Sequence, residues 1–158
     1  MEFFIRKATE SDMPEVLRLI KELAVFEKEP DAVIIDENVL KKEGFGENPM
    51  FTCFVAEDEN EILGIALVYP RFSTWKGKAL HLEDLIVSQK YRGKGIGLAL
   101  YKEVMRFAKE QNMNRVQWEV LDWNTPAIEF YENSGANVLR DWYVVQIHKD
   151  GIKKLAEK

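Results

Sequence analysis

The chain has 158 residues, of which 46% are hydrophobic and 31% charged, a composition typical of a globular protein with a buried core, so we expect one domain over residues 1–158. The formal net charge of −5 argues against a nucleic-acid partner, because nucleic-acid binding depends on clustered Lys and Arg. No apolar run approaches membrane-spanning length, and the charged N-terminus lacks the apolar core of a signal peptide, so we expect no membrane partner and a cytoplasmic location.

Metal-binding and thiol chemistry have few candidate residues. Cys53 is the only cysteine, and it lies in the apolar stretch MFTCFVA, where a small core residue is expected. His81 and His148 are the only histidines and are far apart in sequence. We therefore predict no disulfide within the chain and no metal site.

The first half of the chain predicts four strands and two helices. Apolar stretches bounded by turn residues predict strands over residues 3–6, 50–57, 62–72 and 79–88. Apolar residues at helical spacing predict a helix within residues 8–29, capped by Thr9 or Ser11, and a short one over 37–43, which Asp36 caps and Gly44 closes. The sequence DENE over residues 58–61 predicts the turn between the second and third strands.

The second half alternates helices and strands. Helices are predicted over residues 98–112 and 126–134, the second with Thr125 as cap and Pro126 in its first turn. Strands are predicted over residues 115–121 and 137–149, followed by a polar tail from Asp150. An antiparallel meander followed by strand–helix–strand crossovers predicts an α/β fold with a mixed, mostly antiparallel central sheet flanked by helices.

The loop YRGKGIG, between the apolar stretch ending at Ser88 and the helix after it, predicts a phosphate site. Its three glycines allow close backbone approach to an anion at a helix N-terminus, and Arg92 and Lys94 add positive charge. A nucleoside-triphosphate loop is excluded because Gly95, and not Ser or Thr, follows Lys94. A dinucleotide fingerprint is excluded because bulky Leu98 or Leu100 stands where it needs a small residue.

The spacing Arg92-x-x-Gly95-x-Gly97 and the order of elements resemble the GCN5-related N-acetyltransferase (GNAT) superfamily, which holds the pyrophosphate of acetyl-CoA at this turn. Further stretches resemble its spermidine/spermine (diamine) branch, among them LRLIKELAVFE, GFGENP, LEDLIV and WNTPAIEFYENSGA. The resemblance covers nearly the whole chain from Ile5. It implies a GNAT fold and acetyl-CoA as co-substrate, held by Leu85, Ile86, Val87, Arg92, Gly93, Lys94, Gly95, Ile96, Gly97, Leu98 and Asn124.

The chemistry requires an amine to lose a proton and a thiolate to gain one. The resemblance implies that Glu83 is the base for the amine, directly or through water, and that Tyr131 protonates the leaving sulfur. A backbone N–H among residues 85–87 is expected to stabilise the acetyl oxygen. Without the resemblance, Tyr131 would be interpreted as a core aromatic residue of a helix.

The expected acceptor is a small cationic amine, which requires carboxylates and aromatic rings in its channel. The resemblance implies substrate contacts from Phe26, Glu27, Glu83, Asp84, Trp75, Glu119 and Trp142. Phe26 stands where the diamine branch tends to have Tyr. Glu119, and Asp141 beside Trp142, are equally well explained as solvated surface charges.

Several functional alternatives remain at this stage. A related subset of the branch prefers thialysine or lysine analogues to polyamines, and the sequence does not separate the two. A peptide acetyltransferase is disfavoured by the acidic, Trp-containing residue set, and a non-catalytic acyl-CoA-binding module is disfavoured because both Glu83 and Tyr131 are present. Resembling enzymes are homodimers, and an interface is expected from Tyr143, Val144, Val145 and Ile147.

Overall fold

Five strands form one sheet in a computed structural model that describes residues 1–59 and 61–157. In spatial order the strands are β1 (Phe4–Lys7), β2 (Thr52–Glu57), β3 (Ile62–Ser73), β4 (Gly77–Val87) and β5 (Arg115–Gln117). Neighbours from β1 to β4 pair antiparallel, and β4 pairs with β5 in parallel. The predicted fold class, a mixed and mostly antiparallel sheet flanked by helices, is confirmed. The sheet belongs to the first of two compact units, Met1–Glu119, and the second unit begins at Val120.

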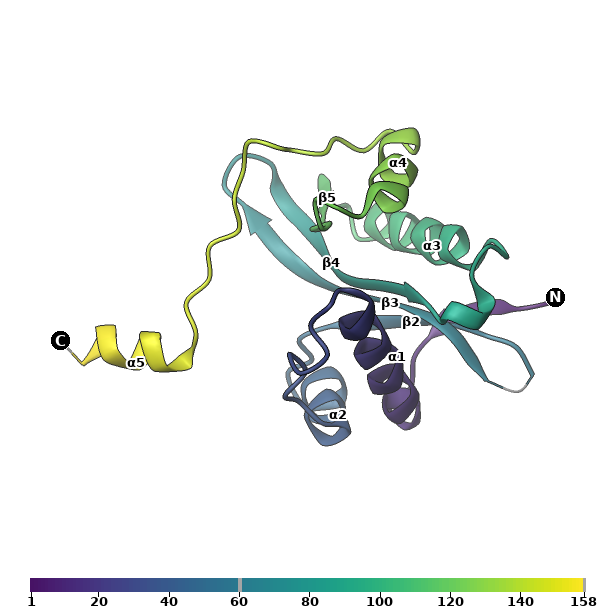
Figure 1. Cartoon of the computed structure of the whole chain (residues 1–158), viewed down its shortest axis with the longest axis horizontal. Helices are drawn as coiled ribbons and strands as arrows, with labels where there is room; N and C mark the ends of the chain where they lie inside the picture. Colours follow the sequence, from purple (N-terminus) through teal and green to yellow (C-terminus); the bar gives the residue numbers. More distant parts are fainter. Residues whose placement is uncertain (60, 158) are drawn as a thin grey trace. The chain divides into compact units, whose positions relative to one another are not determined.

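Helices cover both faces of the sheet (Figure 1). α1 (Met13–Phe26) and α2 (Glu37–Phe45) pack on one face around residues such as Leu19, Leu40 and Ile65. α3 (Ile96–Glu110) packs on the other face, with Leu100 and Val104 fully buried. Because both faces are covered, β3 is buried almost continuously from Ile62 to Val68, which explains its unbroken apolar sequence.

The helix ends of the first unit differ slightly from the predicted ones. The segment at Thr9 begins as a short 3-10 turn, η1 (Glu10–Asp12), where the Thr9 N–H donates to the Asp12 carboxylate at 2.7 Å, and α1 follows with Pro14 in its first turn. Asp36 caps α2 as predicted by accepting from the Val39 N–H at 3.0 Å. The helix continues past Gly44 and ends before Gly46.

The strand predictions for the last third of the chain are wrong in two places. The strand predicted over residues 115–121 stops at Gln117, because its pairing with β4 ends at the His81–Gln117 pair. The strand predicted over residues 137–149 does not form, and Lys149 instead begins a helix. An alternating apolar pattern makes a strand only when a neighbouring strand supplies hydrogen bonds, and residues 137–148 have no such pairing among the described residues.

The second unit contains α4 (Thr125–Asn133) and α5 (Lys149–Ala156). α4 starts at Thr125, one residue earlier than predicted, so Asn124 and not Thr125 is in the cap position, while Pro126 lies in the first turn as predicted. Gly135 follows the helix with a φ of +97°. Most of the tail from Asp150 lies in α5, while Lys158 is outside the described residues. The turn predicted over residues 58–61 joins β2 and β3, and it includes Asn60, which is also outside them.

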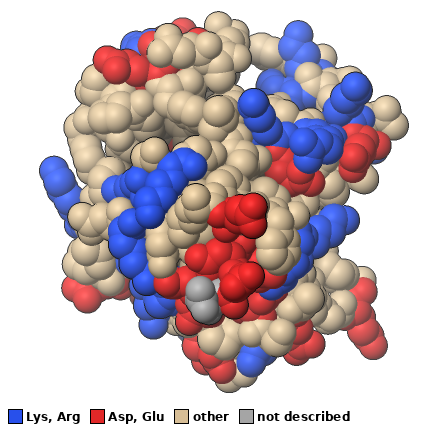
Figure 2. Space-filling model, turned by 90° about the vertical axis from the view of Figure 1, so that its right-hand side faces the viewer, with Lys and Arg blue, Asp and Glu red and all other residues tan. Residues whose placement is uncertain are grey.

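Acidic and basic side chains lie side by side on the face shown in Figure 2. Ion pairs of the first unit include Arg6–Asp12 at 2.7 Å and Lys90–Glu61 at 2.8 Å. Among the described residues, no helix combines the length and apolar composition needed to cross a membrane.

Candidate active site

Strand β4 carries one extra residue in its pairing with β3, and that residue is Glu83. Leu67 pairs with Asp84 and the next residue, Val68, pairs with Leu82, so Glu83 is left in a β-bulge. Leu82 and Leu85 both pack into the core on the α3 side, although residues three apart in a regular strand would face opposite sides. Because of the bulge, the side chains of both Glu83 and Asp84 lie on the face of the sheet that α1 covers.

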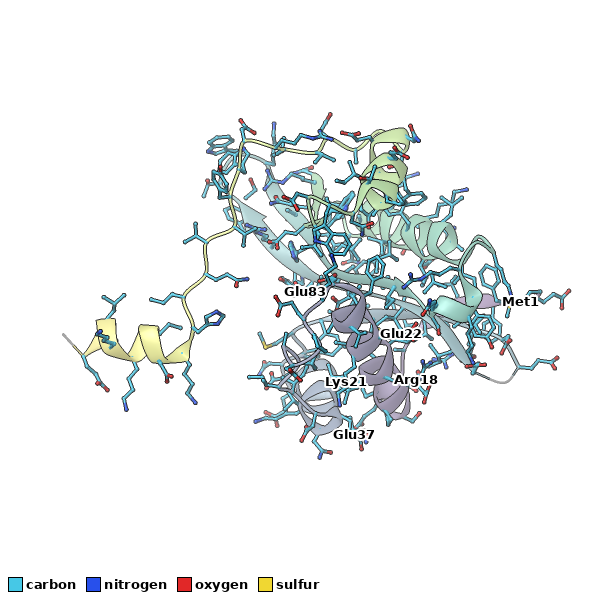
Figure 3. The ribbon with its side chains drawn as sticks, in the orientation of Figure 1. Met1, Arg18, Lys21, Glu22, Glu37 and Glu83 are labelled. Carbon is cyan, nitrogen blue, oxygen red and sulfur yellow. The ribbon has the colours of Figure 1, made fainter. Side chains whose placement is uncertain are left out.

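Two polar side chains lie against a single carboxylate oxygen of Glu83. The Tyr69 hydroxyl donates to Glu83 Oε2 at 2.9 Å, and His81 Nε2 lies 3.3 Å from the same oxygen. The side chain of Glu83 is half exposed, so its other oxygen is accessible. In Figure 3 Glu83 lies near the C-terminal end of α1, the helix that carries Arg18, Lys21 and Glu22.

Asp84 is held in an environment that disfavours its charge. Burial, followed by repulsion from the Glu83 and Glu27 carboxylates, raises the pKa of Asp84 to about 7. Burial also raises the pKa of Glu27, the residue directly after α1. The structure thus brings Glu27 close to Glu83 and Asp84, although Glu27 and Glu83 are 56 residues apart in the sequence. A cluster of three carboxylates is suited to a cation with more than one positive charge.

Two further residues belong to the surroundings of Glu83. The pKa of Tyr69 is raised to about 12 by burial, by the hydrogen bond to Glu83 and by nearby carboxylates that include Glu119. Tyr69 therefore stays protonated at neutral pH and remains a donor to Glu83. Glu119 lies close enough to influence Tyr69 electrostatically, which places it at the edge of the same acidic region.

The glycine loop between β4 and α3 has an open, left-handed backbone. Gly93 and Gly95 have φ values of +75° and +82°, and a Cβ added at either position would meet nothing within 4 Å. The first bond of α3 runs from the Ala99 N–H to the Gly95 carbonyl at 3.0 Å, so the N–H groups of residues 96–98 precede the helical ladder. These donors and the positive helix end suit an anionic ligand.

Two glutamates hold the short 3-10 turn η2 (Gln89–Tyr91) that leads into the loop. Glu22 of α1 accepts from the Gln89 N–H at 2.6 Å and from the Ser88 hydroxyl at 3.2 Å. Glu61, the last residue of the β2–β3 turn, accepts from the Tyr91 hydroxyl. The start of the loop is therefore fixed to α1 on one side and to the β2–β3 turn on the other.

The charged residues of the loop rest on aromatic rings. The Arg92 guanidinium lies 4.9 Å from the centre of the Phe26 ring, and Arg92 Nε donates to the Val87 carbonyl at 3.2 Å. Lys94 Nζ lies 5.1 Å from the centre of the Tyr91 ring. Phe26, predicted as a substrate contact, thus has a packing role beneath Arg92.

Beyond His81, one edge of β4 has no strand partner among the described residues. The described pairing with β5 covers only residues 79–81 of β4, so Leu85, Ile86 and Val87 lie beyond its end. Backbone groups on an open edge of this kind can pair with an extended ligand as with another strand. The predicted use of residues 85–87 stays a prediction.

Cys53 is unsuited to nucleophilic catalysis. Burial, with smaller contributions from the Asp84 and Asp12 carboxylates, raises the pKa of its thiol to about 12. No cluster of three or more His, Cys, Asp or Glu side chains able to hold a metal ion is found among residues 1–59 and 61–157.

Four other candidate residues come from the turn after β3 and from the second unit. Trp75 is 82% exposed in the turn between β3 and β4. In the second unit, Asn124 is the N-terminal cap residue of α4, Tyr131 is partly buried on α4, and Trp142 is exposed. Their roles stay predictions.

Sequence reasoning missed four residues of this region: Tyr69, His81, Glu22 and Glu61. Tyr69 and His81 are cross-strand partners, and their rings are 5.0 Å apart. The histidine two positions before Glu83 was a visible signal, since residues two apart on a strand share a face. The other three depend on the strand register and on contacts distant in sequence.

Comparison with known proteins agrees with this geometry. Residues 13–136 match the family model described as the acetyltransferase (GNAT) family. Thialysine N-epsilon-acetyltransferase of Bos taurus is 38% identical over 98% of this chain and 97% of its own length. Spermidine/spermine N(1)-acetyltransferase-like protein 1 of Homo sapiens is 35% identical over 99% of this chain and 24% of its own length. An integron cassette protein from the mobile metagenome of V. cholerae has a TM-score of 0.81 and 26% identity, covering 100% of this chain and 99% of its own.

The buried carboxyl of Asp84 makes a testable contribution to stability. Because its pKa rises from 3.8 to about 7 on folding, the folded state binds the proton more tightly, and stability is lost as pH rises from about 4 to about 7. Replacement of Asp84 by Asn should raise the free energy of unfolding at pH 8 by about 2–4 kcal/mol, with no gain below pH 4. Urea unfolding at several pH values measures this. The exposed Asp31→Asn variant is the control, and an Asp84→Asn gain that does not vary with pH would contradict the explanation.

Proposed function

This chain belongs to the acetyltransferase (GNAT) family and is an N-acetyltransferase, and from that premise we propose that it transfers the acetyl group of acetyl-CoA to a primary amine of a small diamine or polyamine. The observation that carries the choice of acceptor is the carboxylate cluster at the β4 bulge. Glu83 and Asp84 share one face of the sheet, and Glu27 acts on Asp84 from the end of α1. A second cationic group on the acceptor would offset the repulsion among these carboxylates.

The residues of the glycine loop fit acetyl-CoA. The left-handed Gly93 and Gly95 leave room for phosphate oxygens, and the N–H groups of residues 96–98 point ahead of the helical ladder. The open edge of β4 at residues 85–87 supplies backbone groups for the amides of the pantetheine arm. When bound, acetyl-CoA supplies the thioester whose acetyl group is transferred.

The proposed reaction needs no covalent enzyme intermediate. The free oxygen of the Glu83 carboxylate takes a proton from the ammonium group, directly or through water, and the amine nitrogen then forms the new C–N bond as the C–S bond breaks. The Tyr131 hydroxyl donates a proton to the departing sulfur. A backbone N–H among residues 85–87 stabilises the charge that develops on the carbonyl oxygen.

A thialysine-like amine is the second candidate acceptor. It is favoured by the relative named thialysine N-epsilon-acetyltransferase, which matches this chain over almost its full length. Both candidates carry a second amino group. Only the thialysine-like amine also carries a carboxylate next to its second amino group. Glu27 and Asp84 would repel that carboxylate unless the positive charges of Arg92 and Lys94 offset the repulsion.

The roles of Glu83 and Tyr131 are tested by the variants Glu83→Gln and Tyr131→Phe. Each removes one proton-transfer group with little change in volume, so kcat should fall about 10²-fold or more, while the affinity for acetyl-CoA should change less than about threefold. Free-thiol release measures kcat, and calorimetric titration measures the affinity.

The variant Glu129→Gln is the matched control for Glu83→Gln, because Glu129 is an exposed residue of α4. It should keep the activity of the unmodified chain. Normal turnover of Glu83→Gln or of Tyr131→Phe would remove that residue from the mechanism.

We further propose that the chain forms a homodimer through the segment of residues 137–148. Tyr143 is 93% exposed and Val145 is 91% exposed, and the segment has the alternating apolar pattern of a strand without a described strand partner. A second copy of the chain would supply the missing hydrogen bonds and cover these side chains.

Sedimentation velocity at micromolar concentration should give twice the mass of one chain. Val145→Asp should shift the protein to the monomer, whereas Ile34→Asp, at a residue equally exposed in the first unit, should not. A monomeric unmodified chain, or a Val145→Asp variant that remains dimeric, would show that this segment is not the interface.

A further inference from the structure

The carboxylate of Glu83 is held unsymmetrically. The Tyr69 hydroxyl donates to Oε2 and His81 Nε2 lies 3.3 Å from the same oxygen, whereas no described residue donates to Oε1. Since the bulge places Glu83 outside the regular pairing, the neighbouring strand does not by itself fix the direction of this side chain. The two side chains in contact with Oε2 therefore decide where Oε1 points.

His81 is constrained more tightly than the glutamate it contacts. It is 7% exposed, and its ring lies 5.0 Å from that of Tyr69 with a tilt of 35°. Its Nδ1 atom is buried and has no hydrogen-bond partner among the described residues. The imidazole is thus fixed by stacking and directs only Nε2 at a hydrogen-bonding partner.

The proton of the neutral ring can be assigned from this arrangement. A proton on Nε2 would face the Glu83 carboxylate oxygen 3.3 Å away, whereas a proton on Nδ1 would leave a buried N–H unpaired and would set the Nε2 lone pair against that oxygen. A buried lone pair without a partner is more common in proteins than a buried N–H without one. In the neutral form of the ring, the proton is therefore expected on Nε2.

We propose that His81 is a positioning residue for the catalytic carboxylate: its Nε2–H, together with the Tyr69 hydroxyl, holds Oε2 of Glu83 so that Oε1 faces the acceptor amine. This role rests on the proposed function of Glu83 as the base. Without the histidine donor, the half-exposed carboxylate turns among several rotamers and spends less time aligned with the amine. Removal of His81 is therefore expected to lower kcat and to leave substrate binding nearly unchanged.

Three variants of His81 separate the donor from the ring. His81→Phe keeps an aromatic ring beside Tyr69 without the donor, His81→Gln keeps a donor at the distance of Nε2, and His81→Asn keeps an amide that is too short to reach Glu83. With acetyl-CoA and either spermidine or thialysine, His81→Phe and His81→Asn should lower kcat about tenfold and leave both KM values within about twofold. His81→Gln should stay within about threefold of the unmodified chain.

A double-mutant cycle distinguishes positioning from general damage. If His81 acts through Glu83, adding His81→Asn to Glu83→Gln should cause no further loss of kcat. Normal kcat in His81→Asn, or losses that multiply in the double variant, would overturn the role of His81. If Glu83→Gln itself is fully active, the proposed base fails first, and the role of His81 falls with it. If His81→Phe folds poorly, the comparison of His81→Gln with His81→Asn tests the proposal, because these two side chains differ mainly in length.

The tautomer provides a readout independent of activity. Two-bond ¹⁵N–¹H correlation spectra of the full chain, with His148 assigned through a His148→Gln variant, should show the proton of His81 on Nε2. Glu83→Gln should shift the Nε2 resonance, because the carboxylate that accepts this hydrogen bond has been removed. A proton on Nδ1, or an Nε2 resonance that is insensitive to residue 83, would contradict the proposal.

Discussion

The single extra residue in β4 is the constraint on which the candidate site depends. In an antiparallel pair without a bulge, adjacent residues face opposite sides of the sheet, so Glu83 and Asp84 would lie on opposite faces. The bulge between the Leu67–Asp84 and Val68–Leu82 pairs leaves both carboxylates on the side covered by α1. The acidic cluster and the raised pKa of Asp84 both follow from that one displacement.

The same strand links the acidic cluster to the glycine loop. Only four residues separate Asp84 from Gln89, where η2 begins, and Glu22 of α1 accepts from the Gln89 N–H. α1 thus reaches both regions, with Glu22 at the loop and Glu27 at the acidic cluster. A shift of α1 along the sheet would therefore disturb the glycine loop and the carboxylate cluster together, which suits the proposed reaction, because that reaction must bring two substrates to one place.

Local sequence signals predicted most of the fold and part of the candidate site. The glycine loop, the apolar face of α3 and the Thr125–Pro126 start of α4 depend on neighbouring residues, and the sequence therefore identifies them. The bulge at Glu83 depends on the register of two strands, which no local pattern encodes, so the Tyr69–His81–Glu83 contacts were not foreseen. The prediction of a strand over residues 137–149 was wrong because an alternating apolar pattern indicates that a segment can pair with another strand but does not identify that strand.

The central claim, acetyl transfer from acetyl-CoA to a small cationic amine, is tested most directly by thiol release with paired acceptors. Diamines and monoamines of equal chain length differ only in the second charge, which the carboxylate cluster is proposed to recognise. The account predicts thiol release with an amine present and a kcat/KM about tenfold or more higher for the diamine of a pair, equivalent to about 1.4 kcal/mol. Equal kcat/KM for both members, or no thiol release with any amine, would contradict it.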